Sequence, residues 1–169
     1  MNIISVMFAS PAYDELVNMR IETLYQPLNA EINIEDLALE YKDVHLAVYD
    51  DKLQMIGGIV AKVTEEQDEF MNKRKICLLR QVFVKTKFQR LGLGKKMLSC
   101  LEKMLIDKGY KEIRLYAHLD VIDFYTRLGY SKHGRPFKDY GIKQHIMKKK
   151  IQKKSLKLDK LEAVGSEYS

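Results

Sequence analysis

A glycine-containing turn between an apolar run and an amphipathic segment constrains this chain more than any other feature. Residues 76–84 are strongly apolar, residues 89–94 read Q-R-L-G-L-G, and apolar side chains then recur every third or fourth position. This order predicts a strand, a turn and a helix. Such a turn directs free backbone N–H groups and the positive end of the helix dipole at one point, where phosphate oxygens bind. Gly92 and Gly94 would let the anion approach the backbone without a Cβ in the way.

The spacing of the turn narrows the class of phosphate ligand. A Walker loop needs G-x-x-x-x-G-K-[ST], and a dinucleotide-binding turn needs G-x-G-x-x-G near the first strand; neither is present. The pattern here is Q-x-x-G-x-G, and Lys95 and Lys96 add positive charge directly after it. The pattern alone leaves a second interpretation open, in which the glycines only soften the start of a helix.

Length and composition point to one ordinary globular domain. The 169 residues are 46% hydrophobic and 31% charged, which excludes disorder over most of the chain. We expect a single domain over residues 1–150, followed over residues 151–169 by a lysine-rich tail or an extra helix. Much of the net charge of +6 comes from Lys148, Lys149, Lys150, Lys153, Lys154, Lys157 and Lys160. A solvated tail is favoured over a nucleic-acid surface, because no nucleic-acid-binding motif accompanies these lysines.

Two cysteines far apart in the sequence form neither a metal-binding pattern nor a disulfide framework. Cys77 lies in an apolar run and Cys100 on the helix pattern, so both are interpreted as packing residues rather than nucleophiles. We therefore expect no metal. The sequence opens without a basic stretch and a long apolar one, and no stretch is apolar enough to span a bilayer. These features favour a cytoplasmic protein with no membrane partner.

Apolar periodicity and turn residues predict the remaining elements. Ser10 and Pro11 are typical of a helix start, and Gly109 is typical of a helix end. The patterns predict strands at 3–8, 44–48, 53–63, 76–84, 113–117, 130 onward and 141–147, helices at 11–24, 34–39, 93–108 and 120–128, and a polar loop at 64–74. The strand–helix–strand order in the middle of the chain predicts a central parallel pair inside a mixed α/β sheet.

A second motif further along the chain helps to interpret the glycine turn. After the next predicted strand, residues 124–130 read F-Y-T-R-L-G-Y. This stretch is similar to the F-Y-x-K-x-G-F signature of the GCN5-related N-acetyltransferase family, with Arg127 and Tyr130 as conservative variants. Q-x-x-G-x-G resembles the pyrophosphate loop of the same family, and the resemblance covers roughly residues 19–147. It implies a twisted, mostly antiparallel sheet of about six to seven strands with about four flanking helices.

Two further stretches resemble one bacterial branch of that family, the groups around ElaA and YjcF. Residues 20–28 are similar to its R-x-x-V-L-x-x-P-L stretch, and residues 134–142 are similar to its G-x-x-F-x-E-x-G-I ending. The branch then carries a histidine where this chain has Gln144. His145 stands one place later, which on a strand means the opposite face. His118 replaces an asparagine that the family often has seven residues before Tyr125.

The resemblance implies an acetyl-CoA-dependent N-acetyltransferase. Such an enzyme moves the acetyl group to a primary amine of a small molecule or peptide by direct attack. The strand before the turn would pair with the pantetheine arm, the turn would take the pyrophosphate, and a backbone N–H near Val84 would polarise the thioester carbonyl. The implied cofactor-binding residues are Val82, Phe83, Val84, Gln89, Arg90, Leu91, Gly92, Leu93, Gly94 and Lys95.

The resemblance is less specific about catalytic residues. Tyr125 is the candidate acid for the leaving thiolate, and the alternative is an aromatic residue that only packs on the sheet. Because the attacking amine must be neutral, a base is also needed. Glu22 and His118 are candidates, with a surface glutamate and a residue stacked near the cofactor as alternatives. Asp120 is interpreted as a helix cap.

A catalytically silent acyl-CoA-binding sensor and a basic nucleic-acid-binding module remain as alternatives. Tyr125 and the intact glycine turn favour the enzyme, and the lysine tail favours the binding module. The expected partners are acetyl-CoA and an amine acceptor, with nucleic acid disfavoured. A homodimer is common in the family and stays open here. The acceptor itself cannot be read from the sequence, because fold-level analogy does not choose among metabolites, antibiotics, polyamines and protein amines.

Overall fold

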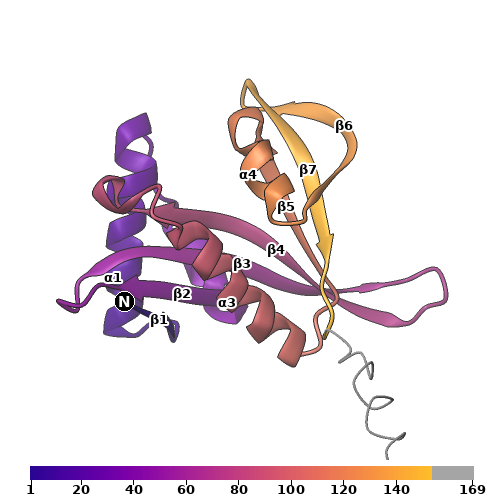
Figure 1. Ribbon diagram of the computed structural model, residues 1–169, viewed down its shortest axis with the longest axis horizontal. Helices are drawn as coiled ribbons and strands as arrows, with labels where there is room; N and C mark the ends of the chain where they lie inside the picture. Colours follow the sequence, from indigo (N-terminus) through magenta and orange to yellow (C-terminus); the bar gives the residue numbers. More distant parts are fainter. Residues whose placement is uncertain (154–169) are drawn as a thin grey trace, which may run out of the picture.

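Seven strands form one sheet in the order β1-β2-β3-β4-β5-β7-β6 in the computed structural model, which describes residues 1–153 (Figure 1). The strands are β1 (Asn2–Ser5), β2 (Val44–Tyr49), β3 (Met55–Gln67), β4 (Lys73–Val84), β5 (Glu112–His118), β6 (Ser131–Asp139) and β7 (Ile142–Lys150). Neighbouring strands are antiparallel except β4 and β5, which are parallel. The predicted mixed sheet with a central parallel pair is therefore confirmed.

Four α-helices accompany the sheet in the part of the chain that the structure describes. They are α1 (Pro11–Arg20), α2 (Ile34–Ala38), α3 (Leu93–Asp107) and α4 (Ile122–Arg127). The predicted start of α1 at Ser10 and the predicted end of α3 at Gly109 are both confirmed. The Ser10 hydroxyl accepts the backbone N–H of Tyr13 at 3.2 Å and so caps α1. At the end of α3, Gly109 has φ 85° and the Tyr110 N–H bonds the Leu105 carbonyl at 2.9 Å, which satisfies a free carbonyl of the last turn.

The first helix continues past α1 in a different geometry. Residues Ile21–Tyr25 form a π-helical turn, and a 3₁₀ turn (Gln26–Leu28) follows it. The predicted extent of the helix, residues 11–24, is thus close to the observed one. A π turn widens the helix locally and changes the direction in which the next side chains point.

Helices cover both faces of the sheet (Figure 1). On one face, Leu16 and Met19 of α1 pack near Ala47 and Phe83 of the sheet. On the other face, α3 buries Leu93, Met97, Leu98, Leu101 and Leu105 in the main core. Since both faces are covered, the accessible parts of the central strands are their ends and edges.

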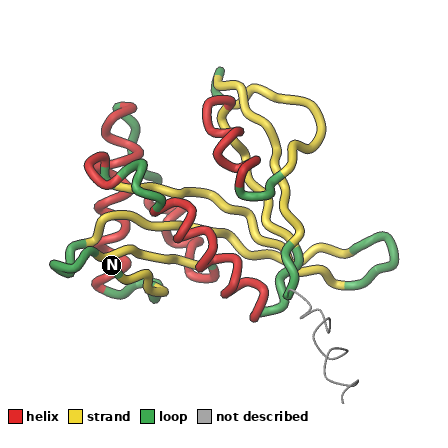
Figure 2. Tube along the Cα trace, in the orientation of Figure 1, coloured by secondary structure: helices red, strands yellow, loops and turns green. Residues whose placement is uncertain are grey.

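The two parallel strands separate in the middle of the sheet. β4 and β5 pair only as far as Leu79 and Leu115, and beyond that point they diverge (Figures 1 and 2). At the same point Arg80 has no partner in β3, whereas Leu79 and Gln81 on either side of it do. Such a bulge bends a strand and increases its twist. The bend leaves one edge of β4 without a neighbouring strand among the described residues.

The prediction of a loop over residues 64–74 is wrong. β3 and β4 extend as a paired hairpin to Gln67 and from Lys73, and the turn between them is organised by Asp68. Charged side chains such as Glu65 and Lys73, 3.9 Å apart, face each other across these strands. A solvent-exposed pair of strands needs no apolar face, so this polar sequence lacks the apolar alternation by which a strand is recognised.

The interpretation of Asp120 as a helix cap is also wrong. α4 begins at Ile122, its N-cap position is Val121, and no side chain caps it. Asp120 lies inside a 3₁₀ turn (Leu119–Val121) that precedes the helix.

Most of the predicted tail, residues 154–169, lies outside the described residues. Its first residue, Ile151, is buried and belongs to the main core. Within residues 1–153 no helix is both long and apolar enough to cross a membrane.

Candidate active site

The start of α3 presents a group of unpaired backbone donors. Gly92 occupies the N-cap position in the left-handed region, with φ 80° and ψ 10°. The first intrahelical bond runs from the Lys96 N–H to the Gly92 carbonyl at 3.1 Å. The N–H groups of Leu93, Gly94 and Lys95 therefore have no partner within the helix. Free N–H groups and the positive end of a helix dipole are the features that phosphate oxygens prefer.

Contacts on both sides hold this turn in place. Leu93 is only 2% exposed and anchors the start of the helix in the core. The Gln89 amide donates to the Val84 carbonyl at 2.9 Å and so ties the turn to the end of β4. Arg90 adopts a positive φ of 61°, and Leu91 is exposed. These contacts give the turn a defined conformation between β4 and α3.

The two glycines of the turn have different surroundings. A Cβ built at Gly92 would meet no atom within 4 Å, so this position opens to solvent. A Cβ at Gly94 would lie 3.2 Å from the Phe124 ring of α4. Gly92 therefore allows the left-handed backbone conformation and keeps the turn open to solvent. Gly94 instead allows α3 and α4 to approach each other.

The free edge of β4 leads towards this turn. The Lys85 N–H donates to the Ile56 carbonyl of β3 at 2.8 Å. Because backbone groups alternate between the two edges of a strand, Val84 and Val82 direct theirs to the edge that β5 has left. The Val84 carbonyl is occupied by Gln89, but its N–H faces the opening between the strands. The Phe83 side chain is buried on the α1 face of the sheet.

Tyr125 lies on α4, the helix that Phe124 links to the turn. Its ring packs against Phe124 and Tyr130, with centroid distances of 5.0 and 5.6 Å. Burial raises the pKa of Tyr125 to about 12, so the hydroxyl keeps its proton at physiological pH. No side chain or backbone group among residues 1–153 hydrogen-bonds that hydroxyl. Tyr125 thus packs on the core, and its proton is not donated to another described residue.

A depression of about 240 Å³ lies between the outer faces of α3 and α4. Its lining consists of Lys95, Leu98, Ser99, Glu102, Arg127, Leu128 and Lys149. Lys149 is paired with Glu102 at 2.8 Å, whereas Lys95 and Arg127 make no ion pair with a described residue. Lys95 belongs to the first turn of α3 and Arg127 ends α4, so the depression carries positive charge close to the turn.

The two candidate bases lie on other elements than the turn. Glu22 is exposed in the π-helical turn after α1, and no described residue bonds it. His118 is exposed at the end of β5, where it pairs in register with Gln144 of β7. His145 is buried on the other side of β7, as its position on the strand predicts. Tyr125 is linked to the turn through Phe124, which packs against Tyr125 and lies close to Gly94. Among the described residues, neither Glu22 nor His118 contacts the turn or Tyr125.

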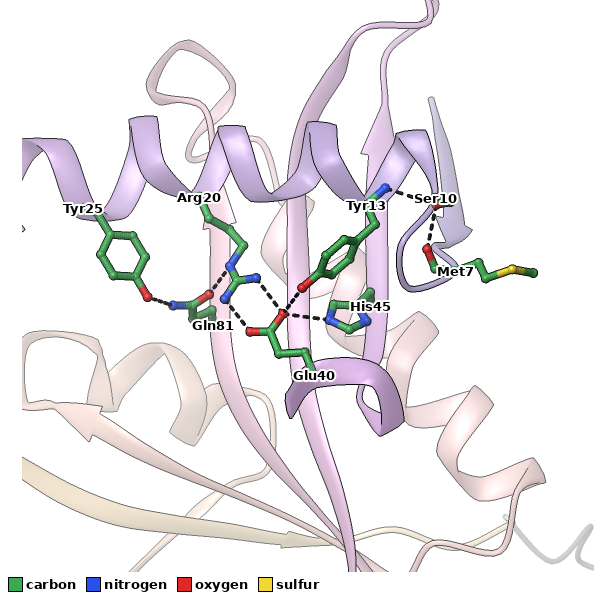
Figure 3. Close-up of polar contacts among 8 residues, drawn as sticks. All are labelled: Met7, Ser10, Tyr13, Arg20, Tyr25, Glu40, His45 and Gln81. Carbon is green, nitrogen blue, oxygen red and sulfur yellow. Dashed lines mark hydrogen bonds and ion pairs between the residues drawn. The ribbon is translucent and has the colours of Figure 1, made fainter. Parts of the chain in front are cut away.

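A buried polar network on the α1 face was not recognised from the sequence (Figure 3). Arg20 and Glu40 are only 3% and 5% exposed, and two bonds of 2.9 and 2.7 Å join them. Arg20 Nε also donates to Oε1 of the Gln81 side chain at 2.6 Å, and the side-chain NH₂ group of Gln81 donates to the Tyr25 hydroxyl at 3.0 Å. Signals existed in the sequence, because Gln81 interrupts an apolar strand and Arg20 belongs to the stretch that resembles the bacterial branch.

Glu40 is the acceptor at the centre of this network. Burial alone would raise its pKa, but hydrogen bonds from His45, Arg20 and Tyr13 outweigh burial and lower the Glu40 pKa to about 2. The carboxylate is therefore ionised at all physiological pH values. Because a carboxylate only accepts, His45 Nε2 at 3.2 Å carries the proton of that bond, and its buried Nδ1 has no partner among the described residues.

No group of three or more His, Cys, Asp or Glu side chains that could hold a metal ion occurs within residues 1–153. Cys77 is buried, and burial raises its pKa to about 12, which is the opposite of an activated nucleophile.

Comparison with known proteins decides the family. Residues 12–151 match the family model described as an acetyltransferase (GNAT) domain. The chain belongs to the GNAT acetyltransferase family. The predicted family and the predicted acyltransferase class are thereby confirmed, whereas the narrower ElaA and YjcF branch remains a resemblance. Protein YyaT of Bacillus subtilis (strain 168) is 28% identical over 109 residues, which are 64% of this chain and 67% of YyaT.

Solved structures share the fold of this GNAT chain at low sequence identity. The ribosomal-protein-S18-alanine N-acetyltransferase of Escherichia coli matches with a TM-score of 0.67 and 15% identity, covering 93% of this chain and 99% of that one. An aminoglycoside 6′-N-acetyltransferase complexed with coenzyme A matches with a TM-score of 0.66 and 17% identity, covering 89% and 97%. The predicted GNAT-like sheet and flanking helices are confirmed by these likenesses.

Proposed function

We propose that this GNAT protein binds acetyl-CoA and transfers its acetyl group to a primary amine by direct attack. The observation that carries the proposal is the convergence of two sets of unpaired backbone donors. One set lies at the start of α3, and the other lies along the edge of β4 beyond its last pair with β5. A ligand with a pyrophosphate and an amide-containing arm has the groups that both sets would bind. The complex of the aminoglycoside acetyltransferase with coenzyme A supports this choice of ligand.

Each part of acetyl-CoA has a matching part of the site. The N–H groups of Leu93, Gly94 and Lys95 would bind the pyrophosphate at the helix start. The pantetheine arm would pair with the free edge of β4 as an additional strand does. The thioester would then lie near the Val84 N–H, which faces the opening. Arg127 stands in the depression between α3 and α4, where it would add positive charge for the nucleotide end.

The chemistry needs one bond to form and one to break. The lone pair of a neutral amine attacks the thioester carbon, and the Val84 N–H donates to the carbonyl oxygen as it becomes negative. The carbon–sulfur bond then breaks, and the amine proton leaves to a base or to water. Tyr125 would donate a hydrogen bond to the leaving sulfur. Because thiols titrate near pKa 8.5, below Tyr125, this bond stabilises the thiolate without complete proton transfer.

A base and an amine acceptor complete the proposed reaction. Glu22 and His118 remain the candidate bases, since Glu22 is exposed in the π-helical turn after α1 and His118 is exposed at the end of β5. The acceptor would approach from the α1 side, because the cofactor and α4 would fill the opposite side. Small-molecule and protein amines both remain candidates. We further propose a cytoplasmic location, which the two unpaired cysteines support, and leave a homodimer as an option.

The test is an assay for free thiol released from acetyl-CoA in the presence of amines. Spermidine, kanamycin and a short peptide with an N-terminal alanine represent three acceptor classes, and mass spectrometry would detect the acetylated product. Product formation with any of them supports the proposal. Tight acetyl-CoA binding without turnover on any amine would favour the silent sensor instead. Absence of acetyl-CoA binding would overturn the proposal altogether.

A further inference from the structure

The buried network on the α1 face ends at the hydroxyl group of Tyr25, a residue that is only partly buried. We propose that Tyr25 positions the acceptor molecule, and that Glu40, Arg20 and Gln81 exist to fix the direction of its O–H bond. The inference rests on the proposed function, because it names a residue of the acceptor side of that same site. The hydrogen bonds run from the buried Glu40 through Arg20 and Gln81 to Tyr25 (Figure 3).

Each link of the chain fixes the direction of the next. Glu40 is an ionised carboxylate, so it holds the Arg20 guanidinium by two bonds. Arginine only donates, so its Nε–H must meet the carbonyl oxygen of Gln81, at 2.6 Å. The Gln81 NH₂ group is then forced towards Tyr25, whose oxygen accepts at 3.0 Å. The hydrogen of the Tyr25 hydroxyl must therefore point away from Gln81.

The Tyr25 hydroxyl, which is bonded to Gln81, lies beside the point where the sheet opens. Gln81 directly follows Arg80, the bulged residue at which β4 leaves β5. Tyr25 and Gln81 line a cavity of about 40 Å³ together with Asn33 and Asp36 of the α2 region. That volume holds a few waters at most, so it is a polar notch beside the opening rather than a complete binding site. A substrate oxygen or nitrogen at its mouth would accept the Tyr25 hydrogen.

Stability alone is a poor explanation of such a network. A buried ion pair gains little over apolar residues of similar size, because both charges must leave water. Here Tyr13 and His45 add two further bonds to Glu40, at 2.8 and 3.2 Å, so the carboxylate is held on every side. The network thus connects α1, β2 and β4 to the single hydroxyl of Tyr25. Fixing that hydroxyl before binding lowers the entropic cost of holding an acceptor.

Two substitutions test the direction of the hydrogen bond. Tyr25→Phe removes only the hydroxyl. Gln81→Glu keeps the shape but places a carboxylate between Arg20 and Tyr25, so the Tyr25 hydrogen would turn inwards to it. Both variants should raise the KM for the acceptor by about 5- to 15-fold, the value of one neutral hydrogen bond, and leave kcat within about 3-fold. The double variant should be no worse than either single one, because both remove the same bond.

The measurement uses the full chain and the panel amine with the highest kcat/KM among spermidine, kanamycin and the N-terminal alanine peptide. Tyr41→Phe is the matched control, since Tyr41 is 57% exposed and lies outside the network; it should keep the wild-type KM. The acetyl-CoA dissociation constant and the melting temperature should stay near wild type in all variants. A purely structural role would lower the melting temperature and leave the acceptor KM unchanged, which would overturn the inference.

The wild type separates this inference from the proposed function. If it acetylates no amine of the panel, the proposed function fails and the inference fails with it. If it acetylates an amine and Tyr25→Phe keeps the same acceptor KM, only the inference fails. Retention of the wild-type KM by Gln81→Glu, with a loss in Tyr25→Phe, would refute the fixed direction of the hydroxyl.

Discussion

Replacing Gly92 by aspartate or by asparagine separates charge from shape at the proposed pyrophosphate site. The two side chains have nearly the same size, and both tolerate the left-handed backbone that Gly92 adopts at φ 80°. No atom within 4 Å would clash with the new Cβ. Both variants should therefore fold, each with a similar loss of stability of about 1 kcal/mol from the backbone conformation.

Only the aspartate adds a charge that repels the pyrophosphate. Two like charges 4 Å apart cost about 1 kcal/mol in water and about 4 kcal/mol at an effective dielectric constant near 20. Because Gly92 opens to solvent, we expect an intermediate cost of about 2 kcal/mol, or about 30-fold weaker binding than Gly92→Asn. The difference should shrink at high salt, which screens exposed charges.

Isothermal titration of each variant with acetyl-CoA measures this difference directly. Melting curves of the two variants provide the control, because they should nearly coincide. Equal affinities of Gly92→Asp and Gly92→Asn at low salt would refute the reasoning, since a charge at the pyrophosphate site cannot be neutral to binding.

Three further changes test other parts of the structure. Tyr125→Phe should lower kcat by about 100-fold and leave the acetyl-CoA dissociation constant unchanged, because only the bond to the leaving sulfur is lost; steady-state kinetics and titration measure both. Acid should destabilise the wild type by up to about 3 kcal/mol as the pH falls from about 5 to 2, because the Glu40 pKa drops from 4.5 to about 2 on folding. Urea unfolding of Glu40→Gln should show a shallower pH dependence. Leu101→Ala, at a fully buried α3 position, should cost about 2–5 kcal/mol in the same assay.

Each of these expectations has a contradicting result. An unchanged kcat in Tyr125→Phe would leave that tyrosine as a packing residue. A pH dependence of Glu40→Gln equal to that of the wild type would show that Glu40 does not carry the acid sensitivity. A loss below about 1 kcal/mol in Leu101→Ala would mean that α3 is packed far less tightly than its burial indicates.

Local chemistry in the sequence explains how much of the fold was predictable. Ser10, Pro11 and Gly109 act over a few neighbouring residues, so the ends of α1 and α3 could be read directly. The glycine turn was predictable for the same reason, because strand, glycines and helix are adjacent in the chain. The hairpin around Asp68 was missed because its strands are polar on both faces and give no apolar alternation.

The α1-face network depends on tertiary contacts that no local sequence pattern predicts. Arg20 and Gln81 are 61 positions apart, and Arg20 and Glu40 are 20 apart. The bulge at Arg80, which separates β4 from β5, likewise follows from strand register rather than from a local signal. The sequence could therefore predict the turn to which the pyrophosphate is proposed to bind, whereas the proposed acceptor side emerged from the fold.

Amide NMR during addition of acetyl-CoA tests the binding site residue by residue. The proposal predicts saturable changes at micromolar ligand, largest for the amides of Leu93, Gly94 and Lys95 at the start of α3 and of Val84 on the free edge of β4. Gly109, at the far end of α3, provides an internal control whose amide should stay unchanged. Absence of any change, or changes confined to elements other than this turn and strand edge, would contradict the proposed acetyl-CoA site and with it the acetyltransferase mechanism.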